Sequence, residues 1–405
     1  MLFYYTLKNG LRIVHLQTIS KVAYCGFAVN AGSRDELPDE HGLAHFVEHT
    51  LFKGTVKRKS RHIINRMENV GGELNAYTSK EETLIYSIFM EQDFNRAAEL
   101  LSDLIINSQF PENELEKERE VVIEEIQSYE DNPSELIYDD FENMLFEGHA
   151  LGHHILGNKK SLRTFTSANG FSFINRYYTA DNMIFFSMSS ADFKTIKRTA
   201  EKYFSDIQNT KSLIKREMPE DISPLQITKK RKTHLSHVII GSRACNMHDE
   251  KKYPLFLLNN ILGGPGMNSR LNISLREKRG LVYTVESTVT SYTDTGVFSV
   301  YFGIDHKNRE QAIDLVEKEV NHLCNTKLTE IQLNKAKKQA IGQMGVATDN
   351  KESLSLGLGK SFLHFNRYQL PEEVFSKIEA ITPQQLIDTA NEIFARDKLF
   401  TLIFE

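Results

Sequence analysis

Apolar residues along this chain follow two different spacings, which alternate in both halves of the sequence. Short apolar runs such as Val22 to Val29 and residues 83–89 predict strands, whereas longer segments with apolar residues three and four apart predict helices. A polar run from Gln208 to Asp221 separates the halves and is typical of an exposed linker. We therefore predict an α+β fold with two similar domains, residues 1–208 and 225–405, joined by a linker over residues 209–224.

One predicted helix, Glu112 to Tyr129, has two carboxylates within its apolar stripe. The stripe consists of Leu115, Glu118, Val122, Glu125 and Tyr129. A carboxylate on an apolar face must be paired or must bind a metal, because desolvation would otherwise neutralise it. Glu118 and Glu125 are therefore candidate site residues, whereas the other glutamates near them lie off the stripe and are expected to face solvent.

His45, Glu48 and His49 form the motif H-x-x-E-H, which predicts a metal that the carboxylates of the other helix could bind. On a helix the two histidines lie one turn apart on the same face, so both can bind one zinc ion while Glu48 acts as a general base. A catalytic zinc site uses three protein ligands. We predict Glu125 as the third ligand and Glu118 as a carboxylate that orients a histidine or the site water. The alternative is an ordinary amphipathic helix whose histidines have no common function.

The helix with the two carboxylates has a counterpart in the second half of the chain. Residues 112–136 align without gaps on residues 330–354, and Ala336 and Gln343 replace the two carboxylates. Residues 255–263 similarly follow the pattern of the histidine helix, with apolar residues or asparagine at the ligand positions. We interpret the chain as duplicated, with metal chemistry in the first half only. Coincidence between amphipathic helices is the alternative.

Composition narrows the class of protein. The 405 residues, 40% of them hydrophobic and 25% charged, are sufficient for a large core and two or more domains. The net charge of −5 gives no reason to expect binding to nucleic acid or to an anionic membrane. Three widely spaced cysteines favour free thiols in a reducing compartment. The sequence shows no membrane span and no leader pattern at its N-terminus, so we expect a cytoplasmic protein.

Motifs in both halves together resemble the pitrilysin and mitochondrial processing peptidase family of zinc peptidases over nearly the whole chain. They are His41 to Thr55, Leu74 to Thr78, Glu118 to Ile126, Leu262 to Gly266, Ser269 to Leu271 and Leu275 to Tyr283. The resemblance implies two domains that close like a clamshell, each a mainly antiparallel sheet with helices on one face. It also implies a zinc-dependent endopeptidase with one Zn²⁺ per chain, bound by His45, His49 and Glu125.

The same resemblance assigns roles in binding the peptide substrate. Arg276 would anchor the peptide main chain from the second half, and Tyr283 would hydrogen-bond the developing oxyanion. Without the resemblance both would be surface residues. The strand containing Asn75 and Ala76 would accept an extended peptide as an added strand, although the sequence alone fits a simple hairpin equally well.

Two further clusters are predicted to have no catalytic function. Residues 263–266, Gly-Gly-Pro-Gly, lack the lysine and hydroxyl residue of a phosphate-binding loop and predict a flexible turn. His149, His153 and His154 have no clear partner ligand nearby and are expected to be loop histidines.

Larger relatives enclose peptides with four such domains in one chain, whereas this chain supplies two. Because one copy carries both the zinc half and the half with Arg276 and Tyr283, we predict a homodimer with two equivalent sites for peptide substrates. Three alternatives remain: a catalytically weak or inactive subunit acting as a partner or scaffold in a processing complex, an enzyme that needs a different subunit, and a protein stapled by structural zinc.

Overall fold

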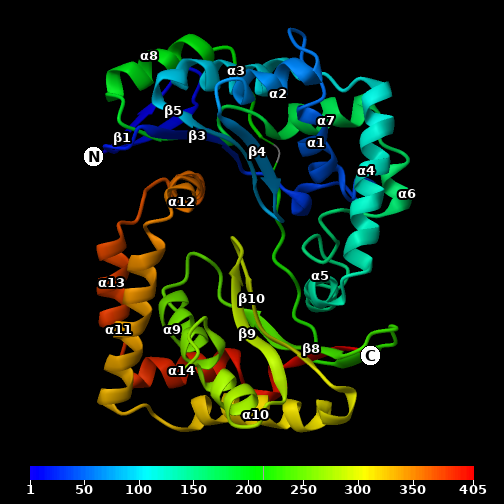
Figure 1. Cartoon of the computed structure of the whole chain (residues 1–405), viewed down its shortest axis with the longest axis vertical. Coiled ribbons are helices and arrows are strands. Elements are labelled where there is room, and N and C mark those ends of the chain that lie inside the picture. The colour runs from blue at the N-terminus through cyan, green and yellow to red at the C-terminus, as the bar shows by residue number, and fades with distance from the viewer. Residues whose placement is uncertain (213) are drawn as a thin grey trace. The chain divides into compact units, whose positions relative to one another are not determined.

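The computed structural model describes residues 1–212 and 214–405, and their strands form two sheets (Figure 1). The chain divides into two compact units. The first contains Met1–Ser128, His153–Arg216 and Thr348–Tyr368, and the second contains Tyr129–Gly152, Glu217–Ala347 and Gln369–Glu405. The linker predicted over residues 209–224 includes residue 213, which lies outside the described residues. Arg216 is thus the last residue of its segment in the first unit, and Glu217 begins the second segment of the second unit.

The units do not follow the two halves of the sequence. Helix α12 (Lys351–Phe365) comes from the second half but belongs to the first unit, and α5 (Pro133–Leu145) comes from the first half but belongs to the second unit. The domains predicted from the sequence, residues 1–208 and 225–405, instead place α5 in the first domain and α12 in the second. The exchange means that the chain passes between the units several times.

The sheet of the first unit is mainly antiparallel, and β4 lies at its edge. In the described chain the strand order is β1-β2-β6-β3-β5-β4, and only the β2–β6 pair is parallel. The strands are β1 (Leu2–Thr6), β2 (Arg12–Gln17), β3 (Val22–Val29), β4 (Glu73–Thr78), β5 (Thr83–Met90) and β6 (Met183–Ser189). The predicted strand Val22 to Val29 coincides with β3.

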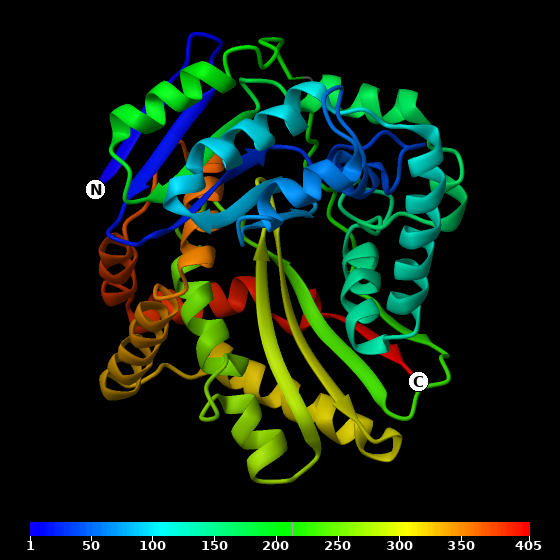
Figure 2. The same cartoon turned by 45° about the horizontal axis from the view of Figure 1, so that its top comes forward.

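Helices cover both faces of this sheet (Figure 2). One face bears the large core, to which the helices of the first half contribute. They are α1 (Leu43–Leu51), α2 (Ser60–Glu68), α3 (Phe94–Asn107), α4 (Glu112–Glu130), α6 (Lys159–Leu162), α7 (Ser167–Tyr177) and α8 (Phe193–Tyr203). The short helices η1 (Ser33–Asp35) and η2 (Glu91–Asp93) have no residue in this core. On the other face Leu358 and Phe362 of α12 pack on Val14 and Phe186. Gly359 allows this close approach, since a Cβ there would lie 2.6 Å from the Phe186 ring.

The second unit has the same kind of architecture. Its sheet, within the described residues, has the order β7-β11-β8-β10-β9, with only β7 and β11 parallel. The strands are β7 (Gln226–Lys229), β8 (Ser236–Ala244), β9 (Val282–Ser291), β10 (Gly296–Ile304) and β11 (Phe400–Phe404). The helices are α9 (Lys252–Gly263), the π-helix η3 (Asn272–Glu277), η4 (His306–Asn308), α10 (Arg309–Asn325), α11 (Glu330–Ala347), α13 (Pro371–Glu379), α14 (Pro383–Ile393) and η5 (Arg396–Lys398). Helix α5 packs on the face opposite to α9 and α10.

The predicted fold class, two domains that each combine a sheet with helices, is confirmed. The structure adds that each sheet carries a helix from the other half on its second face. Helices α4 and α11 begin at Glu112 and Glu330, which the predicted repeat pairs, and α5 and α12 likewise begin at paired positions. In the second unit Asn260 Nδ2 donates a hydrogen bond to Gln343 Oε1 at 2.7 Å, so an amide pair occupies a position where the first unit has ionisable groups. No helix among the described residues is long and apolar enough to cross a membrane.

Candidate metal centre

The metal-centre histidines lie on α1, and the start of this helix is fixed by Glu36. The backbone N–H groups of Gly42 and Ala44 donate to the two carboxylate oxygens of Glu36 at 2.9 and 2.7 Å. This satisfies amides that would otherwise lack a partner at the helix N-terminus. Gly42 has φ of 97°, which is unfavourable for other residues, and a Cβ there would lie 2.7 Å from the Leu156 carbonyl oxygen. The local sequence therefore fixes the position of α1.

His45, His49 and Glu125 converge as predicted. The Nε2 atoms of His45 and His49 lie 3.8 and 3.6 Å from the same oxygen, Oε2 of Glu125 on α4. One possible ligand atom from each of the three side chains lies within 4.8 Å of the other two. Among the described residues, His45, His49 and Glu125 form the group that could hold a metal ion. Zinc at about 2.0–2.1 Å from each ligand in a tetrahedral site separates the ligand atoms by roughly 3.3 Å. The donor set and its spacing therefore fit zinc.

Glu118 contacts the opposite nitrogen of His49. Its Oε2 lies 3.2 Å from His49 Nδ1, and its Oε1 lies 2.6 Å from the ammonium group of Lys53. Glu118 is buried while Glu125 is partly exposed, so the two carboxylates of the α4 stripe have different environments. His45 differs from His49: its Nδ1 is buried and meets no hydrogen-bond partner within the described residues.

Glu48, the predicted base, lies on the same helix and is held by a residue of β4. Its Oε2 accepts a hydrogen bond of 2.6 Å from the hydroxyl of Thr78, the last residue of β4. The edge strand is thus connected directly to the predicted base. Thr78 lies within a motif noted in the sequence, but nothing in the pattern indicated this bond.

Burial and neighbouring charges shift the pKa values in this cluster. Burial, with the charge of His49, lowers the pKa of His45 to about 3, so this ring is neutral near pH 7. Burial opposes the charged form of His49, but Glu118 and the other carboxylates outweigh it and raise its pKa. Burial raises the pKa of Glu48 despite the Thr78 hydrogen bond. For Glu118, burial is outweighed by the bonds to His49 and Lys53, which lower its pKa.

The remaining predicted site residues lie in two other places. Asn75 and Ala76 are half-buried on β4, which pairs with β5 along one side. Arg276 and Tyr283 belong to the second unit, where the guanidinium lies 5.6 Å from the centre of the Tyr283 ring. Both line a pocket of about 360 Å³ that also includes residues 263–266, and Tyr283 is 86% exposed. Asn75 and Ala76 therefore lie on the strand whose end, Thr78, contacts the metal centre, whereas Arg276 and Tyr283 line a pocket of the second unit.

The loop histidines have structural contacts. His153 stacks on His41, with ring centres 4.0 Å apart, and its Nε2 lies 2.9 Å from Glu36 Oε2. His149 Nε2 lies 2.9 Å from the Glu217 carbonyl oxygen. Sequence reasoning missed Glu36 and Lys53, because a single glutamate before a helix and a single lysine after it are common and carry no distinctive spacing.

Comparisons with known proteins find similar proteins over nearly the whole chain. Residues 12–159 match the family model described as insulinase (peptidase family M16), and residues 164–340 match the model described as peptidase M16 inactive domain. An uncharacterized zinc protease of Bacillus subtilis is 32% identical over 98% of this chain and 97% of that protein. An uncharacterized zinc protease of Rickettsia bellii is 33% identical over 96% of this chain and 94% of that protein.

Two solved structures share the fold. A protease from Helicobacter pylori has a TM-score of 0.92 at 22% identity and covers all of this chain and 99% of its own. A peptidase M16 inactive domain from Pseudomonas fluorescens has a TM-score of 0.93 at 18% identity and covers all of this chain and 97% of its own. The two sheet-and-helix domains therefore have the fold of these M16 peptidase structures. The chain belongs to the insulinase family, peptidase family M16.

Proposed function

We propose that this chain is a zinc-dependent endopeptidase that hydrolyses unstructured peptides, with Glu48 as general base. The convergence of His45 Nε2, His49 Nε2 and Glu125 Oε2 beside Glu48 carries the proposal. The names of the relatives, which call them zinc proteases, support it. Residues 164–340 match a family model described as an inactive domain, and in the aligned repeat Gln343 and Ala336 replace the ligand Glu125 and the orienting carboxylate Glu118, which fits metal chemistry in the first unit only.

The three converging residues would hold one zinc ion. When bound, zinc acts as a Lewis acid and brings the pKa of a coordinated water toward neutrality. Thr78 holds Glu48 through Oε2, and we assign to Oε1 the role of taking the water proton and passing it to the leaving amine. Glu118 keeps the His49 ring in place from its other side.

The peptide would bind along β4 as an added strand. Because β4 is an edge strand, its outer backbone groups can pair with an extended peptide, and main-chain pairing tolerates many side chains. Asn75 and Ala76 would lie beside that peptide. Because Thr78 contacts Glu48, pairing along β4 would align the peptide with the base. Folded proteins would be poor substrates because their main chain is already paired.

Arg276 and Tyr283 would act on the same peptide from the second unit. Arg276 would anchor a peptide carbonyl, and the Tyr283 hydroxyl would donate to the oxygen that becomes negative during attack. Their mutual contact and exposure fit residues that are available to a ligand. We also propose that two chains associate into a homodimer, because each chain carries both sets of residues.

Digestion of a mixture of unstructured peptides of graded length tests this function. The purified chain should cleave internal bonds, detected by mass spectrometry. A zinc chelator should abolish cleavage, and added zinc should restore it. A chain that binds zinc with the predicted ligands and yet cleaves no peptide would instead support an inactive partner or scaffold subunit.

A further inference from the structure

The turn that joins β4 to β5 contains three consecutive charged residues that are buried. Lys80, Glu81 and Glu82 are only 4%, 4% and 7% exposed. Charged residues in a turn are ordinarily solvated, and they are almost never buried unless paired. We call these three residues the anchoring turn. Lys80 and Glu81 contact the two ends of the segment His153–Arg216, and Glu82 contacts α12.

Lys80 contacts the point where the chain returns to the first unit. Its ammonium group donates a hydrogen bond of 2.6 Å to the carbonyl oxygen of His153. His153 is the first residue of the segment His153–Arg216, directly after Gly152 of the second unit.

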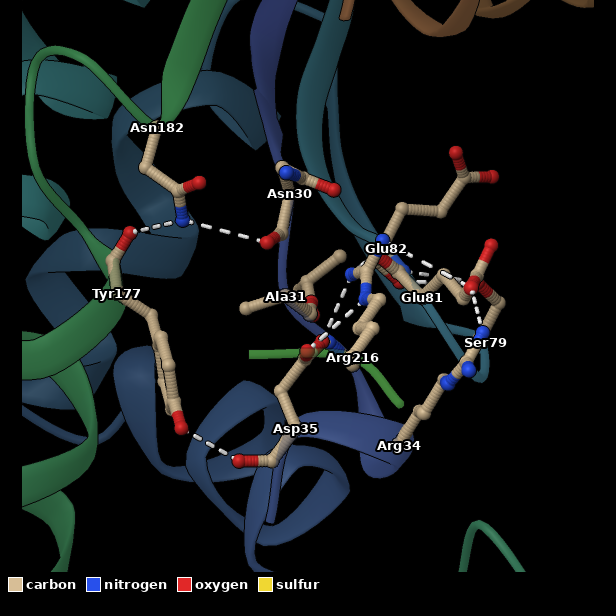
Figure 3. A network of polar contacts seen from close by, with 12 residues as sticks. Asn30, Ala31, Arg34, Asp35, Ser79, Glu81, Glu82, Tyr177, Asn182 and Arg216 are labelled. Carbon is tan, nitrogen blue, oxygen red and sulfur yellow. Dashed lines mark hydrogen bonds and ion pairs between the residues drawn. The ribbon is translucent and has the colours of Figure 1, made fainter. Parts of the chain in front are cut away.

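Glu81 contacts the point where the same segment ends (Figure 3). Its Oε1 lies 2.6 Å from Arg34 and 3.7 Å from Nη1 of Arg216, and its carbonyl oxygen accepts a bond of 2.8 Å from Arg216 Nη2. Arg216 also forms a two-pronged pair with Asp35 at 3.0 and 2.9 Å. This linker arginine is therefore held by three groups, although the sequence predicts an exposed linker there.

Glu82 contacts α12, whose segment Thr348–Tyr368 is joined to the second unit at both ends. Its Oε2 lies 2.8 Å from His364 Nε2, and its Oε1 pairs with Lys360. Lys360 also lies 5.1 Å from the ring centre of Tyr77, which belongs to β4. The anchoring turn thus contacts both ends of the segment His153–Arg216 and α12, and each of these segments is flanked in sequence by residues of the second unit.

The anchoring turn lies next to the predicted base. Ser79 precedes it and donates its backbone N–H to the Glu82 carbonyl oxygen at 2.8 Å, which closes the hairpin. Thr78, one residue earlier, donates to Glu48 Oε2. A shift of the turn would therefore move Thr78, the end of the edge strand and the hydrogen bond that holds the base.

Stability alone is a weak reason for so many buried charges. Desolvation offsets much of the attraction in a buried ion pair, and well-packed apolar residues often stabilise as much. Directional pairs are better suited to fixing one arrangement of segments, and the arginine fork in particular restricts geometry. The partners of the anchoring turn lie at or near the ends of segments of the first unit, so these pairs are suited to fixing how the segments are arranged.

We propose that Lys80, Glu81 and Glu82 are positioning residues that hold the β4 edge and Thr78 in register with Glu48. They do so by fastening this edge to both ends of the segment His153–Arg216 and to α12. The catalytic part of this inference rests on the proposed function. The structural part does not, since it concerns only how β4 responds to changes in distant segments.

Hydrogen exchange of the peptides that cover residues 73–90 tests the inference. Two variants remove partners of the anchoring turn that lie in distant segments. Arg216→Met removes the linker partner of Glu81, and His364→Leu removes the α12 partner of Glu82. Glu82→Gln and Lys80→Met are milder, because the first is isosteric and the second removes a bond to a carbonyl oxygen. Glu99→Gln is the matched control, since Glu99 on α3 also holds two cations, Arg58 just before α2 and Arg66 on α2.

We expect exchange in β4 to become at least about tenfold faster in the anchor variants, with zinc content unchanged and β4 exchange at the parent rate in Glu99→Gln. At a temperature where every protein is folded, kcat for peptides should fall about tenfold in the anchor variants. Arg216→Lys, which keeps the charge, should recover part of both losses.

Parent-like β4 exchange in Glu82→Gln and Lys80→Met would overturn the inference, as would equal effects in the control. If the parent itself cleaves no peptide, the exchange result still decides the inference while the proposed function fails separately.

Discussion

The Nδ1 atom of His49 lies 3.2 Å from Oε2 of Glu118. A neutral imidazole has one N–H, so a ring that donates from Nδ1 to this carboxylate presents the lone pair of Nε2 toward Glu125. Lys53, 2.6 Å from the other oxygen of Glu118, favours the charged carboxylate that accepts this bond. Glu118 therefore selects the tautomer of His49 that can bind a metal.

Removing this carboxylate should weaken zinc binding without removing a ligand. We expect Glu118→Ala to lower the affinity for zinc by about tenfold to a hundredfold, measured by competition with a chromogenic chelator. Lys53→Met should have a smaller effect in the same direction. Glu120→Ala is the control, because Glu120 lies on the same helix but faces solvent. Unchanged affinity in Glu118→Ala would show that Glu118 is a buried structural carboxylate.

The second unit should be required for turnover although it lacks metal ligands. Tyr283→Phe removes one proposed oxyanion donor and should lower kcat by about 10²–10³ while zinc stays bound. Arg276→Ala should mainly raise KM. Steady-state kinetics with a fluorogenic peptide measure both parameters. Parent-like kinetics in both variants would show that these residues do not reach the substrate.

The anchoring turn should make the first unit sensitive to acid. Burial opposes the charged form of Glu82, but the bonds to His364 and Lys360 outweigh it, so the pKa of Glu82 is lower than its ordinary value of 4.5. A carboxyl group with a lowered pKa stabilises the fold above its unfolded pKa, and this stabilisation is lost as the pH falls through the folded value. The loss should therefore begin below about pH 4.5.

Urea unfolding of chelator-treated parent and Glu82→Gln measures this contribution. At pH 6 the variant should be less stable by about 2 kcal/mol, as expected for a buried hydrogen bond to a charged group. The difference should narrow as the pH falls toward 3.5. A difference that stays constant over this range would mean that the charge of Glu82 does not stabilise the fold.

The proposed assembly predicts a specific mass. Light scattering should give a species of about twice the chain mass of 46.5 kDa. The same preparation should cleave short unstructured peptides and leave a stably folded protein intact. A strictly monomeric species with full activity would contradict the homodimer, whereas cleavage of the folded protein would contradict selection by size.

Local patterns were sufficient for much of the metal centre. Two histidines four residues apart share a helix face, and the carboxylates in the α4 stripe had to find polar partners, so His45, His49, Glu118 and Glu125 could be brought together from spacing alone. The roles of these residues in catalysis stay predictions. Sequence resemblance rather than spacing indicated Arg276 and Tyr283.

Contacts between distant segments could not be predicted in this way. The sequence of α12 does not indicate the sheet on which it packs, and this helix lies on the sheet of the other half. The run Lys80, Glu81 and Glu82 reads as a solvated turn because its partners lie far away in sequence, as His364 does at 282 residues from Glu82. Burial of these charges depends on tertiary structure alone.

The variant Glu48→Gln tests the central claim most directly. It keeps His45, His49 and Glu125, so zinc content by elemental mass spectrometry should match the parent at one ion per chain. Loss of the base should lower peptide hydrolysis by about 10²–10⁴, whereas His45→Ala and Glu125→Gln should lose the metal as well. Hydrolysis near the parent rate in zinc-loaded Glu48→Gln would contradict the assignment of Glu48 as the general base.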